Sequence, residues 1–129
     1  MKDKNNLLAI EWIKKADKDL EVAEILLKEK KKYLDLASFH CQQAFEKYLK
    51  GLLVNNGVLP GKTHNLEKLL NQSLKYNLGL FKWVDAAKEI SPFAVIPRYP
   101  DEIFDIKSST VRKLIKKTKI FASFIKELI

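Results

Sequence analysis

The stretch that most constrains the fold runs from Asp35 to Asn56, because it has the length and periodicity of one amphipathic helix but carries two stripes. One side of that helix is almost wholly apolar, as expected of a helix packed on a core. It collects Leu34, Cys41, Phe45, Tyr48, Leu49 and Leu52. The roughly opposite side is apolar at both ends and polar in the middle. It collects Leu36, Phe39, Gln43, Glu46, Lys50, Leu53 and Val54.

The second stripe has two interpretations. A solvent-exposed face would not need Leu36, Phe39 and Val54, and a face buried in a core would not normally carry Glu46 and Lys50. The stripe is therefore either a contact surface for a second chain or a ligand, or a solvated face with a few stray apolar residues. Periodicity alone leaves both interpretations open.

The length of 129 residues predicts a single domain, 1–129, which is large enough for a hydrophobic core. Apolar residues make up 47% of the chain and charged residues 31%, values that exclude a disordered chain and favour a helix-rich one. Apolar spacing predicts helices over about 6–29, 35–56, 66–76, 80–91 and from 108 onward, and no strand. We expect an all-α fold, an up-and-down antiparallel bundle of four longer helices plus one short helix.

Positive charge is the main feature of the composition. The formal net charge is +8, and a basic balance permits binding of nucleic acid, nucleotides or an acidic protein without establishing any of them. The charge is dispersed apart from two runs, Lys28–Lys32 and Arg112–Lys119. The first run ends a predicted helix, where cations complement the helix dipole, and a phosphate-binding patch is the alternative.

Cysteine and histidine are scarce, which limits the chemistry the sequence predicts. Cys41 is the only cysteine, so no disulfide within the chain is possible, and its place on the core stripe predicts an inert buried thiol. Two histidines and one cysteine at these positions predict no metal site, and we expect no cofactor. The N-terminal apolar runs are too short for a signal peptide or a membrane span, so we expect a cytoplasmic protein.

The stretch 92–103 is the most irregular, because Pro92, Pro97 and Pro100 forbid a continuous helix. Arg98 lies between two of these prolines on a segment expected to be extended. Its guanidinium can bind phosphate through two hydrogen bonds at once, as lysine cannot, so Arg98 is a candidate anion ligand. Tyr99 beside it could stack on a base. The alternatives are that Arg98 ties the loop to a carboxylate and that Tyr99 is a packed anchor.

Four segments occur in a recognisable order. They are WIKKADKDLEVAEILL, ASFHCQQAFEKYLKGLLVNNG, KTHNLEKLL and RYPDE. Together they resemble the HEPN domain (higher eukaryotes and prokaryotes nucleotide-binding) over nearly the whole chain. The resemblance implies an all-α bundle that pairs as a homodimer. It also implies involvement with nucleotides or RNA, often beside a separately encoded minimal nucleotidyltransferase.

The resemblance also implies a set of site residues. The positions that match the family's nucleotide- or anion-binding sites are Gln43, Glu46, Lys47, Lys50, His64, Arg98, Tyr99 and Pro100. One departure matters: HEPN ribonucleases carry, in their last helical region, an arginine followed four to six residues later by a histidine. Here the only histidines are His40 and His64, and both precede Arg98 and Arg112. This puts RNA cleavage in doubt.

The favoured hypothesis is a non-catalytic HEPN module that homodimerises and binds a nucleotide, RNA or a minimal nucleotidyltransferase partner, as in a toxin–antitoxin pair. The alternative is a ribonuclease toxin with a non-standard active site, in which His64 would replace the missing histidine. A structural adaptor without a small ligand is a third possibility. The predicted dimer interface comprises Leu36, Phe39 and Val54, together with part of the last helix.

Overall fold

The computed structural model describes residues 2–94 and 106–129, without the side chains of residues 2 and 30. The α-helices are α1 (Lys2–Lys28), α2 (Leu34–Asn55), α3 (Leu66–Leu74), α4 (Val84–Ile90) and α5 (Ser108–Leu128). Short 3-10 helices occur at η1 (Lys30–Tyr33), η2 (Leu78–Trp83) and η3 (Ser91–Ala94). These two ranges contain no strand, so the predicted all-α class is confirmed.

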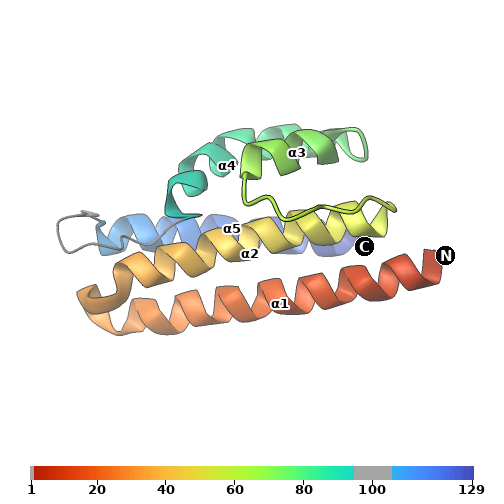
Figure 1. Cartoon of the computed structure of the whole chain (residues 1–129). Helices are drawn as coiled ribbons and strands as arrows, with labels where there is room; N and C mark the ends of the chain where they lie inside the picture. Colours follow the sequence, from red (N-terminus) through yellow and green to blue (C-terminus); the bar gives the residue numbers. More distant parts are fainter. Residues whose placement is uncertain (1, 95–105) are drawn as a thin grey trace.

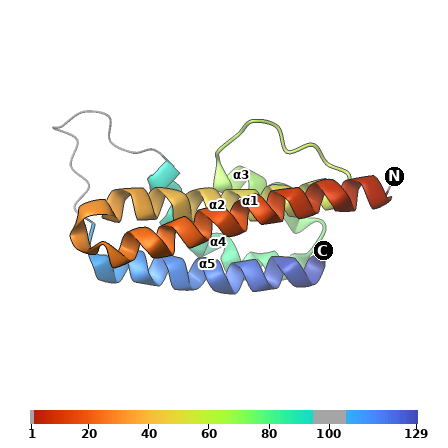
Figure 2. The ribbon, with the colours of Figure 1, turned by 90° about the horizontal axis from the view of Figure 1, so that it is seen from below.

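The helix α2 is central to the packing. It contacts α1, α3, α4 and α5, and the three long helices α1, α2 and α5 lie side by side (Figures 1 and 2). The helix α1 runs antiparallel to the other two, and the short α3–α4 hairpin lies across the opposite side of α2 from α1 (Figure 1). Among the described residues, no helix is long and apolar enough to cross a membrane.

An aromatic cluster joins α2 to α5 and η2. The rings of Phe45 and Phe121 stack with their centroids 3.9 Å apart, and Trp83 and Tyr48 meet Phe121 edge-on. All members of the predicted core stripe of α2 are buried. Each fully buried large apolar side chain contributes about 1.5–3 kcal/mol, so this stripe holds the bundle together as the sequence predicted.

Two glycines shape the region around the second stripe of α2. A Cβ on Gly51 would lie 3.0 Å from Ile13 Cδ1 and 3.3 Å from Trp12 Cβ, so glycine permits the close approach of α1 to α2. Gly57 has φ of +78°, a left-handed conformation that favours glycine, and it turns the chain at the end of α2.

After Gly57 the chain folds back along α2 through residues 57–65, here called the return loop (Figure 1). The loop ends at Asn65, whose side chain accepts a hydrogen bond from the Lys68 backbone N–H at 3.1 Å and caps α3. Because the loop runs backward, α3 begins beside the middle of α2 and runs in the same direction (Figure 1). This loop places His64 against α2.

The predicted helix over 80–91 is shorter and less regular than expected. Only Val84–Ile90 is α-helical, and 3-10 turns flank it on both sides. Pro92 has no N–H and cannot extend the α-helical hydrogen-bond ladder, which agrees with the end of α4 at Ile90. Within residues 2–94 and 106–129, the bundle therefore has three long α-helices and two short ones. The predicted site residues Arg98, Tyr99 and Pro100 lie outside the described residues.

Candidate functional site

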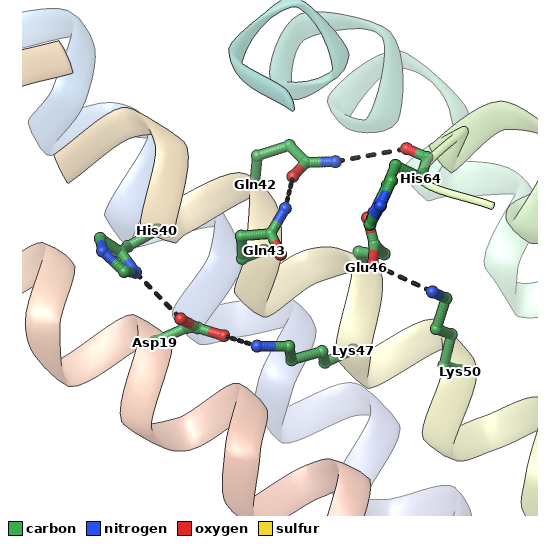
Figure 3. A network of polar contacts seen from close by, with 8 residues as sticks. All are labelled: Asp19, His40, Gln42, Gln43, Glu46, Lys47, Lys50 and His64. Carbon is green, nitrogen blue, oxygen red and sulfur yellow. Dashed lines mark hydrogen bonds and ion pairs between the residues drawn. The ribbon is translucent and has the colours of Figure 1, made fainter. Parts of the chain in front are cut away.

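The carboxylate of Glu46 is the centre of the candidate site. Its side chain is only 2% exposed, yet Oε2 lies 3.1 Å from Lys50 Nζ and Oε1 lies 2.9 Å from His64 Nδ1 (Figure 3). Glu46 and Lys50 are four residues apart on α2 and so share one face. A buried charge is costly unless it is paired. We call Glu46, Lys50 and His64 the Glu46 cluster.

The imidazole of His64 faces outward from this cluster, with 66% of its side chain exposed. An ionised carboxylate only accepts hydrogen bonds, so Nδ1 carries the proton toward Glu46. In the neutral ring, Nε2 then has a free lone pair, and within residues 2–94 and 106–129 it has no hydrogen-bond partner. His64 can therefore accept a hydrogen bond from a ligand, or donate one when protonated.

Two glutamines hold the return loop in place beside His64. The Gln42 side-chain amide donates to the backbone carbonyl of His64 at 3.4 Å, and the Gln43 amide donates to Gln42 Oε1 at 2.7 Å (Figure 3). Gln42 is fully buried and was not among the predicted site residues. It lies between the two stripes of α2, so periodicity did not single it out; its neighbour Gln43 supports His64 only through it.

A hollow of about 390 Å³ adjoins His64. Its lining comes from the return loop, the start of α3 and η3, namely His64, Asn65, Leu66, Glu67, Ser91 and Ala94. The volume lies in the range of small-molecule pockets, about 300–1,000 Å³. A molecule in this hollow would contact the exposed imidazole.

A second group of one carboxylate, one lysine and one histidine lies between α1 and α2. Asp19 Oδ1 is 2.9 Å from His40 Nδ1, and Asp19 Oδ2 is 2.5 Å from Lys47 Nζ (Figure 3). We call Asp19, His40 and Lys47 the Asp19 cluster. The predicted site residues thus divide into two groups: Lys47 belongs to the Asp19 cluster, whereas Glu46, Lys50 and His64 meet in the other.

Both predicted anion-binding lysines already have carboxylate partners. Lys47 pairs with Asp19, and Lys50, which is almost fully buried, pairs with Glu46 and lies 5.5 Å from the Trp12 ring centroid. Their charge is compensated within the chain, so binding of a further anion would require these pairs to open. The anion-binding role of Lys47 and Lys50 stays a prediction.

The predicted interface residues differ in their burial. Leu36 and Phe39 are partly buried, and Phe39 packs edge-on against His40. Val54 is only 4% exposed. Val54 is thus buried within one molecule, contrary to the expectation that its face is not used by the core, and its place in a dimer interface stays a prediction.

Two further titratable groups on α2 are held neutral. Burial raises the pKa of the Cys41 thiol to about 12, and its Sγ lies 3.0 Å from Thr118 Oγ1. Burial also raises the pKa of Tyr48, and so does its hydrogen bond to the Asp17 carboxylate. Neither group can exchange protons near neutral pH. In the described part of the chain, no group of three or more His, Cys, Asp or Glu could hold a metal ion.

Comparison with known proteins identifies the family. The HEPN domain model matches residues 9–128. The chain belongs to the HEPN family. A relative of this HEPN domain, named Putative toxin MJ1304, from Methanocaldococcus jannaschii, is 31% identical over 99 residues. That match spans 72% of this chain and only 64% of the relative.

Two solved structures share the fold of this HEPN domain. TT1696 from Thermus thermophilus has a TM-score of 0.78, and ST0689, described as an archaeal HEPN homologue, has a TM-score of 0.72. Each is 24% identical, and each match covers 94% of this chain and 98% of the other. These likenesses concern the fold alone.

Proposed function

We propose that this HEPN domain acts in the cytoplasm as the toxin-like member of a two-protein pair. It forms a homodimer that binds a nucleotide or RNA, and its partner is a minimal nucleotidyltransferase. The family match and the relative named as a putative toxin support the class. The observation that carries the binding proposal is the exposed His64, held by the buried carboxylate of Glu46 at the edge of a hollow.

The lining of the hollow suits the base and ribose of a nucleotide better than its phosphates. Ala94 offers a small apolar surface, Asn65 and Ser91 offer hydrogen-bonding groups, and the carboxylate of Glu67 would repel a phosphate. His64 Nε2 would then hydrogen-bond to a ring or hydroxyl group of the ligand. The predicted roles of Arg98 in phosphate binding and of Tyr99 in stacking complete this proposal.

The test compares the two histidines. Binding of labelled single-stranded RNA and of nucleoside triphosphates is measured at low salt for wild type, His64→Ala and His40→Ala. We expect His64→Ala to weaken the affinity about tenfold, the effect of losing ~1.4 kcal/mol of hydrogen bonding. His40→Ala, whose ring faces Asp19, should leave it unchanged. Equal affinities for all three proteins would contradict the site.

Arg98→Lys tests the phosphate side of the same proposal. Lysine keeps the charge but cannot make the bidentate contact of a guanidinium with phosphate, so nucleotide and RNA affinity should fall. Lys88→Arg is a matched control on the exposed surface of α4. If Arg98→Lys binds as tightly as wild type in low salt, Arg98 is not a ligand.

RNA cleavage is the second candidate function, and one observation favours it. A carboxylate that orients an exposed imidazole is the usual arrangement of a histidine general acid or base, and Glu46 does this for His64. Against it stands the absence of a histidine after Arg112 in the last helix. We therefore expect the purified protein not to cleave RNA.

The cleavage assay uses structured and single-stranded RNA, with and without divalent metal, for wild type, His64→Ala and His40→Ala. Cleavage that is lost only in His64→Ala would replace the binding proposal with a ribonuclease. Equal cleavage by all three proteins would indicate a contaminating nuclease.

The homodimer is tested by light scattering at micromolar concentration, where the mass should be twice 14.9 kDa. Phe39→Asp should weaken the dimer, because it places an unpaired charge in a desolvated contact. Leu78→Asp is the matched control, since Leu78 is exposed on η2 and is not one of the predicted interface residues. A monomer for wild type, or equal weakening by both variants, would exclude this interface.

A further inference from the structure

Two basic runs that are far apart in the sequence line one groove in the structure. A hollow of about 770 Å³ lies between Leu27, Lys28 and Lys31 on one side and Ser108 and Arg112 on the other. A second hollow of about 290 Å³ shares Leu27, Lys28 and Arg112 with it and extends it along α5, past Glu24, Ile115, Lys116 and Lys119. We call the two hollows together the basic groove.

The groove is formed by the end of α1 with η1 and by the beginning of α5, which lie side by side in antiparallel order (Figure 2). Its α5 residues are three or four positions apart and therefore share one face of the helix. At 1.5 Å per residue, Arg112 and Lys119 lie about 10 Å apart along the helix axis. An ion pair of 3.1 Å between Glu24 and Lys119 joins the two walls at one end.

The charge of the groove is strongly one-sided. Among residues 2–94 and 106–129, its lining holds five cationic side chains and one carboxylate, Glu24, which is already paired with Lys119. Within residues 2–94 and 106–129, no ion pair neutralises Lys28, Lys31, Arg112 or Lys116. The first turn of α5 contains no acidic residue, so the positive end of its helix dipole adds to the same field.

We propose that the basic groove binds the phosphodiester backbone of a nucleic-acid strand. The cations are spread along an elongated groove, which fits a chain of phosphates better than one compact nucleotide. In the described part of the chain, no aromatic side chain lines the groove for stacking on a base, so we expect recognition of the backbone that is independent of sequence. The partly exposed side chain of Leu27 lines both hollows and can contact a sugar.

Of the residues that the structure describes, the groove shares none with the lining of the hollow beside His64, so it is a separate site and its test does not depend on that one. It extends the proposed function by adding sequence-independent binding of RNA or DNA. Affinity that comes from phosphate contacts depends steeply on salt, because binding releases counterions.

The experiment measures the affinity for labelled oligouridine by fluorescence anisotropy, from about 50 to about 300 mM salt. The groove variant is Lys31→Gln with Arg112→Gln. The matched control is Lys18→Gln with Lys88→Gln, two exposed lysines outside the groove, with the same change of net charge. All four side chains are exposed, and thermal unfolding checks that both variants are folded.

The groove variant should bind at least about tenfold more weakly at the lowest salt. Its slope of log Kd against log salt should fall by about 1.4, because each lost phosphate contact of a single strand removes about 0.7. The control should change the affinity by less than about twofold, and His64→Ala should leave the slope unchanged. Equal losses in the groove variant and the control would overturn the proposal, because net charge alone would then explain binding.

Two competitors separate the phosphate chain from other anions. The competition uses His64→Ala, so that the hollow beside His64 does not contribute. If ATP displaces oligouridine from this variant at equal phosphate concentration, the groove is a nucleotide site and the proposal fails. If polyglutamate binds as tightly as oligouridine and is weakened equally by the groove variant, the groove recognises negative charge alone, and the proposal fails again. Displacement by unlabelled DNA or RNA but by neither competitor supports it.

Discussion

The Glu46 cluster and the Asp19 cluster contain the same three kinds of group, one carboxylate, one lysine and one histidine, yet they differ in burial. The Glu46 carboxylate is 2% exposed and its histidine 66% exposed, whereas the Asp19 carboxylate is 12% exposed and its histidine 29% exposed. The Asp19 cluster spans two long helices. The Glu46 cluster joins α2 to the return loop.

This difference separates a structural contact from a candidate binding site. In the Asp19 cluster all three groups are partly buried and bind one another, so the cluster fastens α1 to α2. In the Glu46 cluster the carboxylate and the lysine are buried, and only the imidazole of His64 is exposed to solvent. Residue type alone would not distinguish the two; burial does.

The largest effect that tests this contrast is expected for Glu46→Gln. The substitution leaves the buried Lys50 ammonium without its counter-ion, which should lower the free energy of unfolding by about 3 kcal/mol. Asp19→Asn should cost only about 1 kcal/mol, because Lys47 and His40 can regain water. Urea unfolding measures both. Equal losses would show that the burial difference has no energetic consequence.

Adding Lys50→Met to Glu46→Gln sharpens the same point. The double variant removes the uncompensated charge and replaces the lysine stem with an apolar side chain of similar length, so about 2 kcal/mol of the loss should return. Asp19→Asn with Lys47→Met should show no comparable recovery. A double variant less stable than Glu46→Gln would mean that Lys50 stabilises the fold through its cation–π contact with Trp12 rather than through its pair with Glu46.

Salt should affect the two ion pairs differently. Double-mutant cycles give the coupling energy of Asp19 with Lys47 and of Glu46 with Lys50 at low salt and at about 0.5 M salt. The Asp19 pair should weaken by about half because solvent and ions reach it, and the Glu46 pair should change by less than a few tenths of a kcal/mol. Equal salt sensitivity of both couplings would place the Glu46 pair in contact with solvent.

The smallest effect concerns Cys41, which lies between His40 of the Asp19 cluster and Gln42, the residue that donates to the backbone carbonyl of His64. Its pKa is raised from 9.0 to about 12, so its thiol stays protonated and closed to reagents at pH 8. A thiol reagent should label the protein only in urea. Rapid labelling of the native protein would mean that the core beneath the clusters opens to solvent.

The raised pKa of Cys41 also makes the free energy of unfolding depend on pH in the alkaline range. The unfolded thiol ionises near pH 9, whereas the folded thiol stays neutral until about pH 12. The stability that the neutral Cys41 thiol contributes is therefore fully present below pH 9 and is lost as pH rises toward 12. Cys41→Ala should lose less stability than wild type over this interval, as measured by urea unfolding.

The sequence by itself determined the local features of this protein. The core stripe of α2 from Leu34 to Leu52, the Asn65 cap of α3 and the turn at Gly57 follow from periodicity and from the conformational preferences of single residues. They depend on neighbours a few positions away, which are visible in the sequence. The family resemblance likewise rested on such local segments, and the family match confirms it.

Only the tertiary structure decided which side chains meet across the bundle. The return loop brings His64 to Glu46, and the buried Gln42 donates a hydrogen bond to the backbone carbonyl of His64. Packing of α1 against α2 pairs Lys47 with Asp19. Packing of α1 against α5 likewise joins the basic runs Lys28–Lys32 and Arg112–Lys119 in one groove. These contacts depend on where helices distant in sequence pack, and helical periodicity carries no information about that.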